Sequence, residues 1–185
     1  MPVTVAEKLI SKDEFERLPD AFKRYEVEHG ELVEVEPMGN LESSIAVFLG
    51  YLFFAHLNDP TSREVMGPEA RFRLARDPDV IRGCDVSYVP RDRMPGGRPE
   101  SGVGDYVPAL AVEIISPSNT AASIAQRLDE WFAAGVQLLW IIYPQQKCVY
   151  VYPSPTDCTI LRAGQTLDGG SALPGLRIPI DELLA

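Results

Sequence analysis

Asp85 and Glu113 are the two residues of this sequence whose types and surroundings best suit them for chemistry. Asp85 lies in "GCDVSYVP" and Glu113 in "ALAVEIISP", so each carboxylate is flanked by apolar residues in a run that ends at a proline. An unpaired buried carboxylate is costly and must be protonated, paired or bound to a metal. If the two runs are neighbouring strands, their oxygens can converge on one Mg²⁺ ion. Such an ion activates water and stabilises the charge that a phosphodiester gains when it is attacked.

A purely structural role explains the same two carboxylates. Asp85 could pair with one of the nearby arginines, and Glu113 with Arg127 or with a backbone donor. The spacing alone does not separate these alternatives from a metal site.

The elements that must position the two carboxylates follow from local patterns. Ser11 and Glu14 have the spacing of a capping box and predict a short helix that ends before Pro19. Alternation around His29-Gly30 predicts a β-hairpin over residues 24–37 with its glutamates on the exposed side. Helical periodicity predicts helices over residues 40–57 and 120–134. Strands are expected at about residues 63–66, 70–74, 84–89, 109–115, 137–143, 148–152, 158–161 and 176–180.

The order strand, helix, strand over residues 109–143 predicts a parallel crossover inside a mixed sheet. The expected fold class is therefore α/β, with a mixed sheet flanked by helices. The Gly- and Pro-containing stretch 91–107 is expected to be a loop. We expect one domain over residues 1–185, in which residues 1–23 form a helical extension.

Composition excludes several classes of protein. No run approaches the about 18 to 20 apolar residues that cross a bilayer, and the first twelve residues do not resemble a signal peptide, so we expect a cytoplasmic protein without a membrane partner. Two histidines exclude a multi-histidine metal site. The three cysteines have no metal-ligand spacing and are expected to be buried, inert thiols.

The net charge of −10 is the wrong sign for a nucleic-acid-binding protein. A local basic patch or a bound divalent metal can nevertheless invert the local field. Seven arginines concentrate in the middle of the chain and form either a binding patch or a set of solvated side chains. They are Arg71, Arg73, Arg76, Arg82, Arg91, Arg93 and Arg98.

Several stretches between residues 24 and 184 resemble one known family. They are "RYEVEHGELVEVEP", "FRL" followed by "GCDVSYVP", "PALAVEIISPSN", "RLDEWFAAGVQLLWIIYPQQKCVYVY" and "LPGLRIPIDELL". The chain resembles the Uma-two family within the PD-(D/E)XK, or restriction-endonuclease-like, superfamily of nucleases. The resemblance implies a restriction-endonuclease-like core, DNA as substrate, Mg²⁺ (or Mn²⁺) as cofactor and a homodimer.

The resemblance also implies roles for individual residues. Asp85 and Glu113 correspond to the family's acidic, metal-binding pair. The superfamily's lysine lies two residues after the glutamate, where this chain has Ile115. A helix lysine is thought to substitute in the family, and that position falls on Arg127. Arginine keeps the charge but transfers protons poorly because its pKa lies above about 12.

Two further departures from the family pattern concern the surroundings of the pair. In the family pattern a proline precedes the aspartate, and this chain has Cys84 at that position. The Pro78-Asp79 pair just upstream matches the motif in residue type only and is expected to lie in a turn. A position that is often histidine in the family falls on Leu41 or Glu42. Glu42, or Glu31 in the hairpin, is a possible auxiliary carboxylate; both are equally compatible with a solvated surface.

The leading hypothesis is a Mg²⁺-dependent DNA endonuclease in which water is the nucleophile. An alternative of another class is a catalytically weak or inactive nucleic-acid-binding or interaction protein on the same scaffold. A hydrolase of another phosphate ester is a third possibility. No glycine-rich phosphate loop supports nucleotide use, because Gly96-Gly97 has no Walker-type context.

Overall fold

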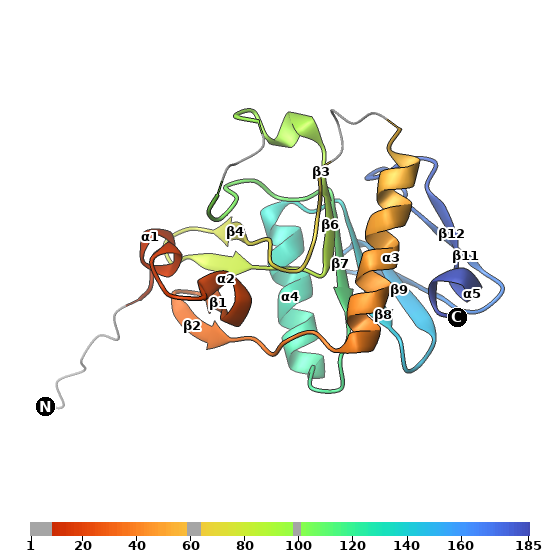
Figure 1. The fold of residues 1–185 in the computed structure, drawn as a ribbon, viewed down its shortest axis with the longest axis horizontal. Helices are drawn as coiled ribbons and strands as arrows, with labels where there is room; N and C mark the ends of the chain where they lie inside the picture. Colours follow the sequence, from red (N-terminus) through yellow and green to blue (C-terminus); the bar gives the residue numbers. More distant parts are fainter. Residues whose placement is uncertain (1–8, 59–63, 98–100) are drawn as a thin grey trace, which may run out of the picture.

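A computed structural model describes residues 9–58, 64–97 and 101–185 of the chain. Most of the described β-structure belongs to a six-stranded and a four-stranded sheet, and two long helices lie on either side of the larger sheet (Figure 1). The expected mixed α/β architecture is confirmed.

The larger sheet has the strand order β10-β9-β8-β7-β6-β3. Its strands are β3 (Glu64–Met66), β6 (Val86–Val89), β7 (Leu110–Ile114), β8 (Leu138–Tyr143), β9 (Cys148–Ser154) and β10 (Asp157–Leu161). Among the described strands of this sheet, only β7 and β8 pair in parallel, with Glu113 beside Ile141. The helix that connects them is α4 (Ala121–Ala134), so the crossover predicted over residues 109–143 is confirmed.

Local sequence explains where α4 begins and ends. Thr120 caps its first turn in a capping box with Ser123. Gly135 ends the helix with φ of 103°, a left-handed conformation that glycine adopts without steric cost. The local sequence therefore fixes the residues at which the helix begins and ends.

The smaller sheet has the order β2-β1-β5-β4 and is antiparallel throughout. Its strands are β1 (Tyr25–Glu28), β2 (Glu31–Glu34), β4 (Phe72–Ala75) and β5 (Val80–Arg82). The predicted hairpin is confirmed, and both turn residues, His29 and Gly30, have the positive φ that its tight turn requires. The sequence patterns did not predict β5.

Short helices pack on the smaller sheet. They are α1 (Lys12–Glu16), whose predicted capping box is present, and α2 (Ala21–Arg24). Phe15 of α1 is fully buried in a cluster with Val27 and Ile81. The N-terminal helices therefore share a hydrophobic core with the sheet.

Helix α3 (Asn40–His56) covers the opposite face of the large sheet from α4. The C-terminal elements β11 (Thr166–Asp168), β12 (Arg177–Pro179) and α5 (Ile180–Leu183) pack beside it, and β11 and α5 were not predicted. The stretch predicted as a loop contains the short 3-10 helix η1 (Arg91–Arg93) and a bridge from Gly104 to Phe72.

Candidate functional site

Asp85 and Glu113 lie opposite each other at one end of the β6–β7 pair. Val86 pairs with Val112, so the next residues along the antiparallel register are Asp85 and Glu113. The backbone N–H of Asp85 donates to the Val112 carbonyl at 2.9 Å, which extends the ladder to this point. The Asp85 Oδ2 atom accepts a hydrogen bond from the Ile114 N–H at 2.6 Å. The structure thus brings the predicted acidic pair together.

The alternation of β7 directs Glu113 toward α4. Leu110, Val112 and Ile114 enter the core beneath α3, whereas Ala111 packs on the α4 side. Glu113 has the same parity as Ala111 and meets two residues one helical turn apart on α4. Its Oε1 atom accepts hydrogen bonds from Trp131 Nε1 at 3.0 Å and from Arg127 at 3.3 Å.

Arg127 is held by several partners. Its second terminal nitrogen donates to Glu26 Oε2 at 2.6 Å, and the first donates also to the Gly83 carbonyl at 3.3 Å. Glu26 is only 3% exposed. The hairpin pattern had placed its glutamates on the exposed side, and for Glu26 this prediction is wrong, because the strand face that carries it packs against arginines.

Arg82 shares the Glu26 carboxylate with Arg127 and is 2% exposed. It donates to Glu26 at 3.1 Å, to Glu28 at 2.6 Å and to both carboxylate oxygens of Glu130. Neither prediction made for the mid-chain arginines, a binding patch or solvated side chains, describes this residue. The two-sided engagement of Glu130 is the bidentate geometry that arginine favours.

We call these residues, together with the catalytic candidates and Arg71, the ion cluster. Its members are Glu26, Glu28, Arg71, Arg82, Asp85, Glu113, Arg127 and Glu130. The cluster thus contains five carboxylates and three arginines. The cluster carries two unbalanced negative charges when every member is ionised.

Within the ion cluster, the acidic pair of Asp85 and Glu113 is where ionisation is least favourable. Burial, and then the neighbouring Glu113 carboxylate, raise the pKa of Asp85 from 3.8 to about 7. Burial also raises the pKa of Glu113, although Arg127 opposes the shift. Burial acts in the same direction on Glu26, but Arg127 and Arg82 hold the pKa of that carboxyl below its ordinary value. Negative charge is therefore stabilised at Glu26 and disfavoured at the acidic pair.

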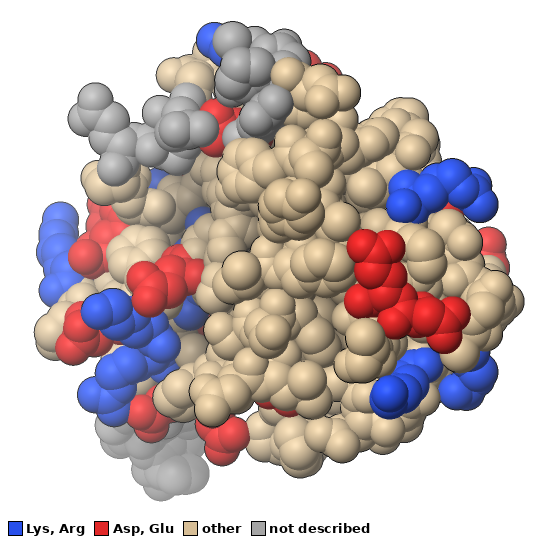
Figure 2. All heavy atoms as spheres, turned by 45° about the vertical axis from the view of Figure 1, so that its right-hand side comes forward, with Lys and Arg blue, Asp and Glu red and all other residues tan. Residues whose placement is uncertain are grey.

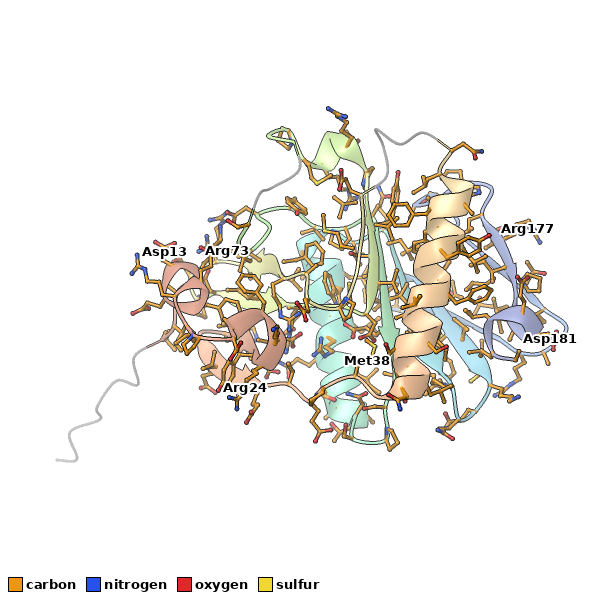
Figure 3. All side chains as sticks on the ribbon, in the orientation of Figure 1. Asp13, Arg24, Met38, Arg73, Arg177 and Asp181 are labelled. Atoms are coloured by element: carbon orange, nitrogen blue, oxygen red, sulfur yellow. The ribbon has the colours of Figure 1, made fainter. Side chains whose placement is uncertain are left out.

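A cleft of about 680 Å³ opens over the cluster. It lies between the smaller sheet, the loop after β7 and the start of α3, and its lining includes Arg24 and Met38, which are labelled in Figure 3. Asp85, Glu113 and Arg127 all line it. Of the two auxiliary carboxylates, Glu42 lines the cleft and is buried in the first turn of α3, whereas Glu31 is exposed on β2 and is not among the lining residues.

The acidic pair suits one hard cation that keeps most of its waters. In the described part of the chain, neither Asp85 Oδ1 nor Glu113 Oε2 takes part in a hydrogen bond, so each carboxylate has an oxygen to offer. The two unbalanced charges of the cluster match one divalent ion. No group of three or more His, Cys, Asp or Glu side chains gathers for a metal within residues 9–58, 64–97 and 101–185.

Several other predicted residues serve structural purposes. Asp79 bonds Arg73 and the backbone of Lys12, away from the cleft. Arg71 donates to three backbone carbonyls, Arg76 pairs with Asp105, and Arg93 donates to the carbonyls of residues 107, 108 and 135. Arg98 lies outside the described residues. Cys84 and Cys148 are buried as expected, but Cys158 is exposed on the edge strand β10.

Sequence reasoning missed Glu26, Arg82 and Glu130 as neighbours of the site. β1 and β5 each place a charged residue beside apolar ones, but exposed strands show the same pattern. The contacts of Glu26, Arg82 and Glu130 depend on sequence separations of 48 to 56 residues, which no local pattern reports.

Residues 12–181 match the family described as "Uma2: Putative restriction endonuclease". The chain belongs to this family. The match begins at α1 and so includes part of the segment that we had set apart as an N-terminal extension. No curated protein matches the chain.

A solved structure shares the fold of this Uma2-family chain. It is described as a putative nuclease belonging to DUF820 from Anabaena variabilis ATCC 29413, and it superposes with a TM-score of 0.80 at 20% sequence identity. The alignment covers 95% of this chain and 97% of the other, so the likeness extends over nearly the whole fold. Among the described residues, no helix has the length and apolar character needed to cross a membrane.

Proposed function

We propose that this protein is a metal-dependent DNA endonuclease that hydrolyses phosphodiester bonds with water as the nucleophile. The observation that carries the proposal is the placement of Asp85 and Glu113. They lie opposite each other on adjacent strands at the floor of one cleft, each with an oxygen turned to no protein donor. Membership of a family of putative restriction endonucleases supports the same reaction class.

Asp85 and Glu113 would hold Mg²⁺, or Mn²⁺ in its place. When bound, the ion supplies an activated water and stabilises charge on the phosphate. Trp131 and Arg127 orient Glu113, and the Ile114 N–H orients Asp85. Arg127 has the charge to stabilise a phosphate oxygen at the cleft floor, but it stays protonated and cannot act as a general base.

Cleavage of plasmid and single-stranded DNA with Mg²⁺ or Mn²⁺ tests the proposal. We expect Asp85→Ala and Glu113→Ala to lower the rate at least about a hundredfold, because both remove a ligand of the ion. Glu31→Gln is the matched control, since it removes a carboxylate of the same chain outside the cleft. Equal rates in all three variants and the parent would refute the site.

The alternative function is nucleic-acid or protein binding without catalysis. The engagement of Arg127 by both Glu26 and Glu113 favours it, as does Ile115 at the position of the superfamily's lysine. This alternative predicts DNA binding without cleavage and no heat of Mg²⁺ or Mn²⁺ binding by calorimetry.

We further propose that the protein is a homodimer that pairs through α3. Val47, Tyr51 and Phe54 form an exposed apolar row on this helix, at 72, 64 and 42% exposure, and we call them the α3 patch. Apart from the phenol of Tyr51, the ionisable side chains of α3 are Glu42, which is buried, and His56. In Figure 2 the middle of the face shown carries no charged side chain. For a chain of net charge −10, an uncharged face is where a second copy approaches with least repulsion.

Light scattering over a range of concentrations tests the dimer. We expect the parent to have twice the chain mass of 20.4 kDa and Val47→Glu to be monomeric. Ile160→Glu is the control, because Ile160 is also an exposed apolar residue, at 42% exposure, but lies on β10. A monomeric parent at every concentration would contradict the proposal.

A further inference from the structure

Arg127 faces two carboxylates at unequal distances. Its contact with Glu26 is 2.6 Å, whereas its contact with Glu113 is 3.3 Å. Charge-assisted hydrogen bonds are strongest at about 2.7 to 2.9 Å and weaken with distance. Arg127 is therefore bonded chiefly to Glu26 and only loosely to the candidate metal ligand.

Glu26 is itself fixed from three sides. Its Oε1 atom accepts the Gly83 N–H at 2.8 Å, and its Oε2 atom is shared between Arg82 and Arg127. Arg82 is in turn held by Glu130 and Glu28, so it cannot follow Arg127. Gly83 admits no side chain, because a Cβ there would meet Arg71 and the Ala70 carbonyl. The carboxylate is thus a rigid anchor beneath the cleft.

From this geometry we infer that Glu26 is a positioning residue, which holds Arg127 away from Glu113 and so keeps Glu113 available to a divalent cation. The inference rests on the proposed function. Without Glu26, the Arg127 guanidinium has Glu113 as its nearest carboxylate within the described residues, and would close on it. Glu113 would then be paired more tightly and would bind a cation less well.

Trp131 provides a reporter of this competition that needs no metal. The chain has two tryptophans, and Trp131 donates its indole N–H to the same Oε1 atom of Glu113 that Arg127 contacts. The indole nitrogen of Trp140 is buried without a hydrogen-bond partner among the described residues. A ¹H–¹⁵N spectrum of the metal-free protein therefore has two indole signals, which Trp140→Phe assigns.

The test substitutes Glu26→Gln, which keeps the side-chain size and removes the charge. We expect the Trp131 indole signal to move and the Trp140 signal to stay. We expect the Mn²⁺ dissociation constant, measured by calorimetry, to rise about tenfold, because a tighter charged hydrogen bond must be broken before Glu113 can bind the ion. Adding Arg127→Gln should reverse the loss of Mn²⁺ affinity, since no guanidinium is then left to compete.

Glu28→Gln is the matched control. Glu28 contacts Arg82 at 2.6 Å but makes no contact with Arg127, so both readouts should match the parent. If Glu26→Gln does not fold, Glu26→Asp retains the charge and retracts it by one methylene, and should give a smaller change in the same direction.

The outcomes separate this inference from the proposed function. An unmoved Trp131 signal in the Glu26 variants overturns the positioning role, whether or not the parent binds Mn²⁺. If the Trp131 signal moves in the Glu26 variants but the parent binds no Mn²⁺, the positioning of Arg127 is upheld and the metal site is refuted. Loss of Mn²⁺ affinity that persists after Arg127→Gln also overturns the inference, because Glu26 would then act by another route.

Discussion

The two faces of the large sheet differ in what they bury. Beneath α3 lie aliphatic and aromatic side chains, among them Phe53 and Trp140 in an edge-to-face contact with ring centroids 5.8 Å apart. On the other side, β7 places Glu113 against Arg127 and Trp131 of α4. The only buried charged side chain that α3 contributes, in the part of the chain described, is Glu42 at the cleft end.

This difference comes from alternate residues of the same strands. In β7, Val112 and Ile114 belong to the apolar face and Glu113 to the charged one. Burial of apolar area stabilises the fold, whereas burial of unbalanced charge opposes it. The α3 face therefore supplies stability that allows the α4 face to keep an acidic pair in a destabilising position.

The largest expected effect on stability concerns the apolar face. Phe53→Ala should lower the free energy of unfolding by about 3 to 5 kcal/mol, because Phe53 is fully buried and its removal leaves a cavity against Trp140. Denaturant unfolding measures the change. The cleavage rate per folded molecule should stay that of the parent, and a large drop in it would show that the two faces are not separable.

A smaller effect on stability is expected from the acidic pair. Removing its charge should raise the free energy of unfolding, whereas Phe53→Ala lowers it. The pKa of Asp85 is raised from 3.8 to about 7 in the fold, by burial and by Glu113, so the folded state holds a proton that the unfolded state has released between these values. The free energy of unfolding should therefore fall as the pH rises from about 4 to 7 in metal-free protein.

Asp85→Asn isolates this contribution from those of the other carboxyls. The variant should be more stable than the parent at pH 8 and similar to it near pH 4, while losing cleavage. Denaturant unfolding at both pH values makes the comparison. Equal stability of parent and variant at pH 8 would mean that the ionised acidic pair does not destabilise the fold.

The smallest expected effect is an increase in the cleavage rate. Ile115 is partly buried and lines the cleft two residues after Glu113, at the superfamily's lysine position. Ile115→Lys should raise the cleavage rate several-fold, because it adds a cation, and a group able to exchange protons, beside the acidic pair. Ile115→Met, which has a similar volume, is the control for altered packing. No gain from lysine would indicate that the positive charge of Arg127 already suffices at this site and that no proton-exchanging group is needed there.

Much of the fold could be predicted because its signals are local. Helix caps at Ser11 and Thr120, the His29-Gly30 turn and the apolar run before Ser116 all depend on residues within a few positions of one another. The short strands β5 and β11 were not predicted, and with three residues each they are too short to show a clear period.

The acidic pair could be named from sequence because a lone carboxylate in an apolar run is conspicuous. Glu26 could not, since its strand alternates like an exposed one and its burial results from arginines 56 and 101 residues away. The burial of a charged residue whose partners are distant in the sequence cannot be predicted from the residues next to it.

The connection between the two sheets has a consequence for how the site can change. Only Gly83, Cys84 and Asp85 separate β5 of the smaller sheet from β6 of the larger one. Inserting one residue here would shift Asp85 relative to Glu113 while both sheets keep their own pairings. A change in chain length at this short connection would therefore separate the two carboxylates of the proposed metal site without altering any of the charged residues.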